Sequence, residues 1–190
     1  MARLFGTDGI RGIAGKELTR SLAAGIGEKL TLLLSRSGEK PKILLARDTR
    51  LSGQMLCFAI ASGICSAGGD VLFTDILPTP AVAFLTTELG ASAGIMVTAS
   101  HNPSEYNGIK IFGSDGHKLC DELEDKIEAM LSCPPQNVPS GEMGTVKMID
   151  GAGEYISHLV ASAPSPLSGL HIALDCACGA ACVTAEKIFS

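Results

Sequence analysis

The feature that most constrains this chain is the regular alternation of helix-like and strand-like segments through its first hundred residues. Apolar residues recur at helical spacing in 18–38, 52–69 and 79–90. Each of these segments precedes a short apolar run typical of a buried strand, in 42–46, 70–74 and 93–98. Such alternation produces a mostly parallel sheet with helices on both faces and right-handed crossovers. The sequence therefore predicts a three-layer αβα domain around a mostly parallel, mixed sheet.

Residues at the ends of the three predicted helices support this interpretation. Thr19 stands at an N-cap position of the first helix, and Gly38 lies just past its end. Ser52 is the expected N-cap of the second helix, and Pro80 falls in the first turn of the third. Each helix thus has a local signal for where it begins or ends.

After residue 108 the sequence no longer shows the regular alternation of helix-like and strand-like segments. Residues 109–119 predict a strand, a tight Ser-Asp-Gly turn and a return, and 120–132 predict a charged helix. Residues 133–146 are rich in Pro, Gly and polar side chains, which is typical of a linker or long surface loop. We therefore expect one domain in 1–150 and the start of another in 151–190.

The segment 151–190 predicts a connecting helix in 151–160, a buried strand in 170–175 and a helix in 179–190. One strand and one helix cannot bury their own apolar faces, so we expect a truncated βα piece of a second, similar domain. Exposed apolar side chains and unpaired strand edges favour association. We expect self-association through residues 152–190, or mobility of that segment.

Composition narrows the class of protein. The chain has 190 residues, of which 46% are hydrophobic and 18% charged, and its net charge is −5. A chain with a net negative charge lacks the excess of basic residues that is typical of proteins that bind nucleic acid. No run of about 18 apolar residues and no signal-peptide core occur, so we expect no membrane insertion and a cytoplasmic location.

Seven cysteines are present, an odd number. Cys57 and Cys65 lie in an apolar helical pattern and are expected to be small buried residues with reduced thiols. The spacing of Cys176, Cys178 and Cys182 lacks the paired CxxC of a zinc ribbon. Buried thiols are the preferred interpretation there, with a metal site as the less favoured one.

The stretch "TASHNPSEYNGIK", residues 98–110, carries the most distinctive chemistry. Ser100 comes where the third predicted strand ends, which is where open α/β sheets place functional groups. The GxSxG elbow of hydrolases is absent, and His101 is not expected to fold back as the base of a triad. No nucleotide-binding glycine motif occurs. Asn107 and Gly108 predict a turn that directs Lys110.

Two further loops present arginines. "FGTDGIRG", residues 5–12, places Asp8 between two glycines and presents Arg11. "ARDTRLSG", residues 46–53, contains Arg47 and Arg50 directly after a strand. An arginine fork suits a phosphate or carboxylate. Arg11 and Arg50 could instead pair with Asp8 and Asp48 to brace their loops, and for the second loop we prefer that interpretation.

These three motifs, in this order and approximate spacing, resemble those of the α-D-phosphohexomutase superfamily. The residues of the first motif are most similar to those of the phosphoglucosamine mutase branch. The phosphomannomutase and phosphoglucomutase branches are the alternative. The resemblance covers the first domain and continues into "LHIALDCACGAA". There Cys178 stands where the family has Asn. The family implies four α/β domains around one cleft and an isomerase acting on a phosphosugar substrate.

The resemblance also implies roles for individual residues. Ser100 matches the serine that is phosphorylated and passes its phosphoryl group to the sugar phosphate. Lys110 and Arg11 match basic residues beside it, which with Thr7 would bind phosphate or substrate. His101 matches a residue suggested to assist proton transfer, although it could equally hold the loop.

In the family a Mg²⁺ ion bridges the phosphoserine and three aspartates of a second-domain loop. Ser100 would be the metal ligand in this chain, and no such aspartate loop occurs in its 190 residues. The resemblance therefore implies that these residues alone are inactive. A hypothesis of a different class is a noncatalytic anion-binding module in which Arg11, Arg47, Arg50 and Lys110 hold a phosphate without turnover.

Overall fold

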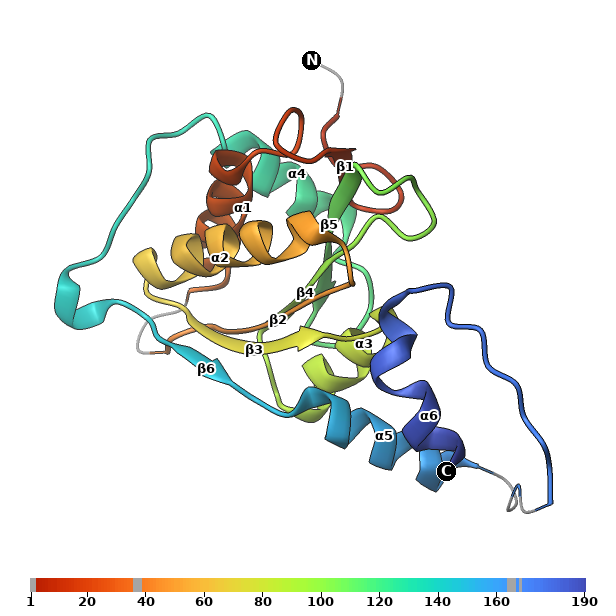
Figure 1. Cartoon of the computed structure of the whole chain (residues 1–190). Coiled ribbons are helices and arrows are strands. Elements are labelled where there is room, and N and C mark those ends of the chain that lie inside the picture. The colour runs from red at the N-terminus through yellow and green to blue at the C-terminus, as the bar shows by residue number, and fades with distance from the viewer. Residues whose placement is uncertain (1–2, 36–38, 164–166, 168) are drawn as a thin grey trace.

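The computed structural model describes residues 3–35, 39–163, 167 and 169–190, and it shows helices on both faces of one six-stranded sheet (Figure 1). The strands are β1 (Ile10–Ile13), β2 (Lys42–Arg47), β3 (Asp70–Ile76), β4 (Ala93–Val97), β5 (Tyr106–Gly113) and β6 (Val146–Met148). The helices are α1 (Arg20–Leu34), α2 (Leu51–Ser66), α3 (Thr79–Glu88), α4 (Asp121–Met130), α5 (Gly151–Ser162) and α6 (Ala185–Phe189), with 3-10 turns at Ser140–Glu142 and Ala180–Val183.

The strand order in the sheet is β1-β5-β4-β2-β3-β6. Strands β4, β2, β3 and β6 pair in parallel, whereas β5 pairs antiparallel with both β4 and β1. Only β5 therefore runs against the others. The predicted α/β class with a mostly parallel, mixed sheet is confirmed.

The side chains of β2 show how the sheet separates two cores. Ile43 and Leu45 face one side, with α1, α2 and α4, and Leu44 and Ala46 face the other, with α3 and α5. All four side chains are fully buried. Because successive residues of a strand point to opposite faces, an apolar run is required where both faces are covered. This explains why the strands read as continuous apolar runs rather than as alternating patterns.

Two of the predicted helix-end signals agree with the structure and one does not. Thr19 Oγ1 accepts the Leu22 N–H at 3.2 Å, and Pro80 is the second residue of α3. Ser52 is not the N-cap of α2, because the helix begins at Leu51 and Arg50 occupies the N-cap position. The Ser52 Oγ instead accepts a hydrogen bond from Asn107 Nδ2 at 2.9 Å. Gly38 lies outside the described residues.

The predicted Asn-Gly turn before Lys110 is wrong. Asn107 and Gly108 belong to β5, where Gly108 pairs with Arg11 of β1. Asn107 is fully buried, and its Oδ1 accepts the Gly108 N–H at 2.8 Å. Pairing with β1 overrides the local turn preference. The Ser-Asp-Gly turn that follows is present, with Gly116 at φ +76°.

Residues 133–146 form a long surface connection, as expected, but its end contributes a strand that was not predicted. Strand β6 pairs with β3 and adds a sixth member to the sheet. A buried ion pair anchors the connection to α1, because Lys29 Nζ donates to Glu28 Oε1 at 2.8 Å and to the Pro134 carbonyl at 3.1 Å.

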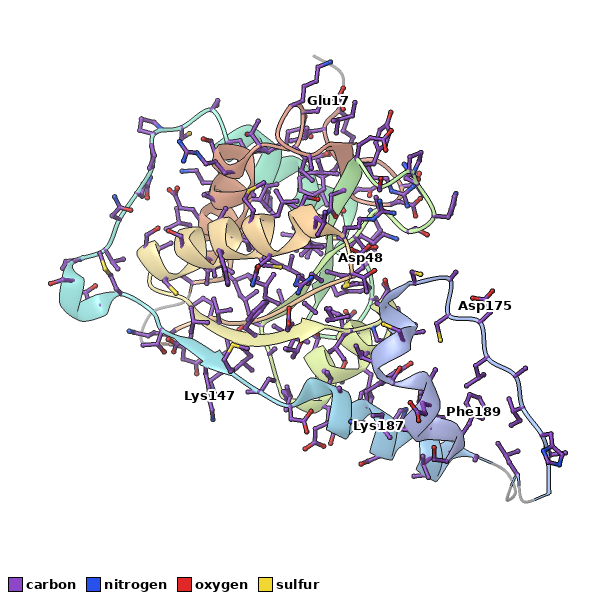
Figure 2. The ribbon with its side chains drawn as sticks, viewed as in Figure 1. Glu17, Asp48, Lys147, Asp175, Lys187 and Phe189 are labelled. Atoms are coloured by element: carbon purple, nitrogen blue, oxygen red, sulfur yellow. The ribbon has the colours of Figure 1, made fainter. Side chains whose placement is uncertain are left out.

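The predicted buried strand in residues 170–175 is wrong. These residues pair with no described strand, and Leu170, Ile172 and Leu174 remain 63%, 44% and 46% exposed. Asp175 lies on an extended stretch that stands away from the sheet (Figure 2). A strand needs a hydrogen-bonding neighbour, and the described part of the chain offers none here.

The helices around this stretch match the prediction more closely. Helix α5 confirms the connecting helix, and Tyr155 on it packs into the second core. The predicted helix in 179–190 is broken into the 3-10 turn and α6, which packs against α5. Within the described residues, no helix has the length and apolar character needed to span a membrane.

Candidate functional site

The loop that follows β4 presents Ser100. Its backbone is in the left-handed region at φ 56°, its side chain is exposed, and its N–H donates to Thr98 Oγ1 at 3.0 Å. A non-glycine residue in this conformation costs on the order of 1–3 kcal/mol and persists only where its surroundings fix it. The predicted position of Ser100 at a carboxyl end of the sheet is confirmed.

His101 lies close to the serine hydroxyl. Ser100 Oγ and His101 Nδ1 are 3.4 Å apart. The two side chains approach each other from adjacent residues, but the prediction that His101 does not act as the base of a triad stays a prediction. The separation is long for a hydrogen bond from a hydroxyl, which is usually about 2.7–2.8 Å to an oxygen acceptor. Both side chains are exposed, so the arrangement lacks the buried orienting group of a triad.

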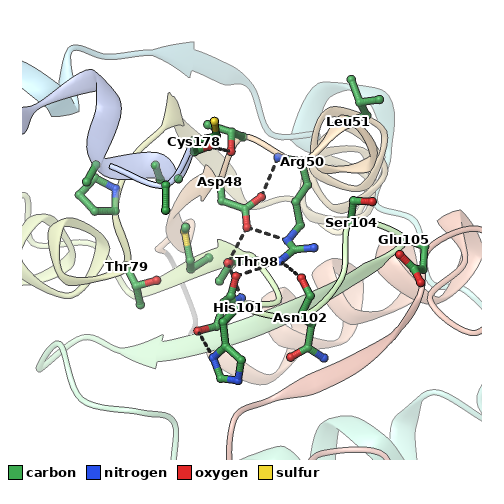
Figure 3. A pocket seen from close by; sticks show the side chains of 18 residues that line it. Asp48, Arg50, Leu51, Thr79, Thr98, His101, Asn102, Ser104, Glu105 and Cys178 are labelled. Carbon is green, nitrogen blue, oxygen red and sulfur yellow. Dashed lines mark hydrogen bonds and ion pairs between the residues drawn. The ribbon is translucent and has the colours of Figure 1, made fainter. Parts of the chain in front are cut away.

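Ser100 and His101 line an open cavity of about 940 Å³ (Figure 3). Its walls come from the loop between β2 and α2, the start of α3, the Ser100 loop and residues 177–181. Thr49 Oγ1 donates to the Cys178 carbonyl at 2.7 Å across one side of this cavity. Cys178, which stands where the family has Asn, therefore lies at the cavity wall.

The first arginine loop folds as a tight hairpin. Gly6 and Gly9 exchange two backbone hydrogen bonds at 3.0 and 3.1 Å, so Thr7 and Asp8 form its tip. Gly9 has φ +82°, and a Cβ there would collide with the Ile109 carbonyl of β5. Glycine thus provides both the turn and the close approach of this hairpin to β5.

Two cations share the carboxylate at the hairpin tip. Arg11 Nη2 lies 3.1 Å from Asp8 Oδ2, and Lys110 Nζ lies 3.9 Å from Asp8 Oδ1. Arg11 Nη1 also donates to Asn102 Oδ1 at 3.5 Å, which connects it to the Ser100 loop. The group of three charges carries a net charge of +1. It is an attractive environment for an anion on that loop.

The predicted site residues are divided between two adjoining cavities. Thr7 and Lys110 line a smaller cavity of about 200 Å³, which shares Thr79 with the Ser100 cavity. Arg11 lines neither cavity, and it contacts the Ser100 loop through Asn102. The structure therefore brings Ser100 and His101 together, with the basic residues on the neighbouring strands β1 and β5.

The second arginine loop is occupied by protein partners. Arg47 Nε donates to Asp75 Oδ1 at 2.6 Å, and Arg50 Nε donates to Asp48 Oδ2 at 3.0 Å. The side chains of Asp48 and Arg50 are only 10% and 11% exposed. The pairing of Arg50 with the aspartate of its own loop is confirmed. The anion-binding hypothesis fails for these two arginines, because their charges are already paired.

The cysteines differ widely in burial. Burial raises the pKa of the Cys57 thiol to about 12, and it also raises the pKa of the partly buried Cys65. Cys178 and Cys182 are exposed, so the buried-thiol interpretation of that cluster is wrong for these two. Among the described residues, no group of three or more His, Cys, Asp or Glu side chains is arranged to hold a metal ion.

Two parts of this site were not predicted from the sequence. One is the position of residues 177–181 at the cavity, and the other is the contact of Asp48 and Arg50 with the Ser100 loop. Thr98 Oγ1 donates to Asp48 Oδ2 at 2.7 Å and accepts the Ser100 N–H, so one hydroxyl joins the two loops. The motif containing Asp48 directly after a strand was the available signal.

Comparison with known proteins places these features in a family. Residues 2–134 match the model of phosphoglucomutase/phosphomannomutase, alpha/beta/alpha domain I. Curated relatives include the phosphoglucosamine mutases of Moorella thermoacetica, 46% identical over 193 residues, and Clostridium acetobutylicum, 48% identical over 193 residues. Both alignments cover the whole of this chain and 44% and 43% of the respective relatives. The chain thus spans less than half the length of these relatives.

Solved structures agree with the fold. A phosphoglucomutase/phosphomannomutase family protein from Burkholderia thailandensis and a putative phosphomannomutase from Thermus thermophilus each align with a TM-score of 0.72 at 28% identity. Each alignment covers 84% of this chain and 36% of the solved chain. The open form of parafusin from Paramecium aligns with a TM-score of 0.78 over 99% of this chain and 41% of its own, at 18% identity, which shows the shared fold.

Proposed function

Because the chain belongs to the phosphoglucomutase/phosphomannomutase family, we propose that it is the serine-bearing part of a phosphosugar mutase. The observation that carries this proposal is the Ser100 loop, in which an exposed serine in a left-handed turn faces an open cavity. Covalent carriage of a phosphoryl group needs such an accessible hydroxyl. We assign Ser100 as that carrier.

The charges around the loop suit this chemistry. A phosphoserine carries about −1.5 to −2 charges, and phosphoryl transfer depends mainly on positioned cations rather than on covalent assistance. Arg11 and Lys110 supply two positive charges against the one negative charge of Asp8. Phosphorylation of Ser100 would more than offset the net +1 of this group. Thr7, at the hairpin tip beside Lys110, is placed to contact a phosphate or sugar oxygen.

The proposed reaction has two transfers. The bond between phosphorus and Ser100 Oγ breaks as phosphorus bonds to a free hydroxyl oxygen of the sugar phosphate; that hydroxyl loses its proton, and Ser100 Oγ takes one up. The bisphosphorylated sugar then reorients, and its original phosphoryl group returns to Ser100 Oγ. His101 Nδ1, at 3.4 Å from Ser100 Oγ, is the nearby group that could exchange a proton during these steps.

We assign glucosamine 6-phosphate and glucosamine 1-phosphate as the substrate pair. The curated relatives that align with the whole chain carry the name phosphoglucosamine mutase, which supports this choice over mannose or glucose phosphates. A cytoplasmic location accompanies the proposal, because charged sugar phosphates do not cross an apolar bilayer unaided.

Ser100 is the one magnesium ligand that we propose among the described residues. Mg²⁺ requires near-octahedral oxygen coordination, and it usually takes one or two carboxylates together with phosphate oxygens and water. The described residues provide the Ser100 hydroxyl, or its phosphate, but no accompanying carboxylate cluster. They do not form a complete magnesium site, and no step above depends on one.

A substrate panel tests the proposed function. The gene product in its longest natural form would be incubated with the 6-phosphates of glucosamine, glucose and mannose, and 1-phosphate formation would be measured. We expect the highest kcat/KM with glucosamine 6-phosphate and no turnover by Ser100→Ala. Preference for mannose or glucose phosphate would instead indicate the phosphomannomutase or phosphoglucomutase activity. Full turnover by Ser100→Ala would contradict the carrier role.

A further inference from the structure

The geometry points to Arg50 as the residue that positions the Ser100 loop. Its guanidinium lies inside the loop, where it donates to the backbone carbonyl of the serine and to three carbonyls that follow it in the chain (Figure 3). This inference rests on the proposed function only insofar as Ser100 is the reacting residue. The role assigned to Arg50 is to set the position and backbone conformation of Ser100, without touching substrate.

Every N–H of the guanidinium has an acceptor within the protein. Nε donates to Asp48 Oδ2 at 3.0 Å. The four terminal hydrogens go to loop carbonyls: Nη1 donates to Pro103 at 2.7 Å and Tyr106 at 3.0 Å, and Nη2 donates to Ser100 at 2.9 Å and Asn102 at 2.8 Å. An arginine has five N–H donors in a fixed planar fork. Arg50 uses all five, so it has none left for a phosphate.

Asp48 fixes the guanidinium from the opposite side. Its Oδ1 accepts the backbone N–H of Arg50 at 2.9 Å, and its Oδ2 accepts both Arg50 Nε and the hydroxyl of Thr98. The same Thr98 hydroxyl accepts the N–H of Ser100. Ser100 is therefore held at its N–H through Thr98 and at its carbonyl through Arg50. Both attachments lead to one buried carboxylate.

These attachments explain the strained turn at the serine. Ser100 has φ 56°, and such a conformation persists only where the surroundings over-determine it. Because the carbonyl of a trans peptide points opposite to its N–H, drawing the Ser100 carbonyl toward Arg50 turns the His101 N–H away from it. The positive end of that peptide dipole then faces away from the guanidinium, which favours an anion on the outer side of the loop.

Lysine cannot replace Arg50 in this role. An ammonium is a compact point charge with three donors, so it cannot reach four carbonyls and a carboxylate in one plane. A residue that only balanced the charge of Asp48 would tolerate lysine. A residue that shapes the loop would not. Arg50→Lys therefore separates positioning from charge balance.

The test uses Arg50→Lys and Arg50→Ala in the longest natural form of the protein, with Arg3→Lys as the matched control. Arg3 is also a multiply paired arginine, but its partners are carboxylates of α4. We expect both Arg50 variants to lower kcat by about 100-fold, the loss typical of a 1 Å misplacement, with little change in KM. We also expect faster amide hydrogen exchange in residues 99–106 and partial recovery of Arg50→Ala by free guanidinium. Arg3→Lys should leave all of these values unchanged.

The two measurements keep this inference separate from the proposed function. If the unaltered protein shows no mutase turnover, the proposed function fails, and amide exchange in residues 99–106 still decides the role of Arg50. Exchange and kcat in Arg50→Lys equal to those of the unaltered protein would overturn the inference. If Arg50→Ala fails to fold, Arg50→Lys alone decides it by the same two measurements.

Discussion

Replacing Asp48 by asparagine tests how strongly the buried ion pair holds the Ser100 loop. The change keeps the shape of the side chain but removes the charge that faces the Arg50 guanidinium. Asp48 accepts three hydrogen bonds at 2.7–3.0 Å. The side chains of Asp48 and Arg50 are only 10% and 11% exposed. Breaking one partner of a buried pair costs about 3–5 kcal/mol, because the remaining charge is uncompensated.

The structure places the expected cost at the lower end of that range. Arg50 keeps four carbonyl acceptors when Asp48 is changed, so part of its charge remains satisfied. We expect Asp48→Asn to lose about 3 kcal/mol of unfolding free energy. In urea this corresponds to a midpoint lower by about 1–3 M if the dependence on denaturant is unchanged.

A matched control lies at the end of the neighbouring strand. Asp75 pairs with Arg47 at 2.6 Å, but its side chain is 46% exposed. Arg47 is 13% exposed, but water reaches the pair from the Asp75 side, so Asp75→Asn should cost less than Asp48→Asn, and asparagine tolerates the φ of 60° at this position. Urea unfolding followed by circular dichroism measures both variants. Equal losses for the two, or a loss below about 1 kcal/mol for Asp48→Asn, would refute the reasoning.

Three further outcomes are expected. Lys110→Ala should lower kcat in the longest natural form by roughly 10- to 1000-fold, the scale of losing one electrostatic donor, and an unchanged kcat would mean that Lys110 only occupies its place in β5. A thiol reagent at pH 8 should label exposed Cys120 and Cys133 in the native chain and Cys57 only after unfolding, because burial raises the Cys57 pKa to about 12; equally fast labelling of all three would contradict this. Light scattering of residues 1–190 should show self-association that decreases when the exposed apolar residues of 170–175 are replaced by serine, whereas a monomer at all concentrations would disprove it.

The elements that sequence predicted well are those whose signal is local. The periodicity of α1, α2 and α3 and the capping hydroxyl of Thr19 depend only on neighbouring residues, so they could be recognised without the fold. Strand β6 has three residues, too few for a pattern to identify. Asn107 and Gly108 have a strong turn preference that pairing with β1 overrides.

The site was predictable in its residue types but not in its connections. The positions of Ser100 and Arg11 followed from motifs, and the Asp48–Arg50 pair followed from adjacency in the chain. The contacts between Arg50 and the Ser100 loop join residues about fifty positions apart, and four of them involve backbone carbonyls. Every residue type carries a carbonyl, so sequence contains no sign of which ones are used.

The most direct test of the central claim is the mass of the peptide that contains Ser100. The longest natural form would be purified, incubated with a hexose 1,6-bisphosphate and digested, with Ser100→Ala and Ser104→Ala as paired controls from the same loop. We predict one added phosphoryl group on Ser100, its absence in Ser100→Ala, its retention in Ser104→Ala and its loss when sugar monophosphate is added. Turnover of glucosamine 6-phosphate with no covalent phosphate on Ser100 at any stage would contradict the claim that this serine carries the phosphoryl group.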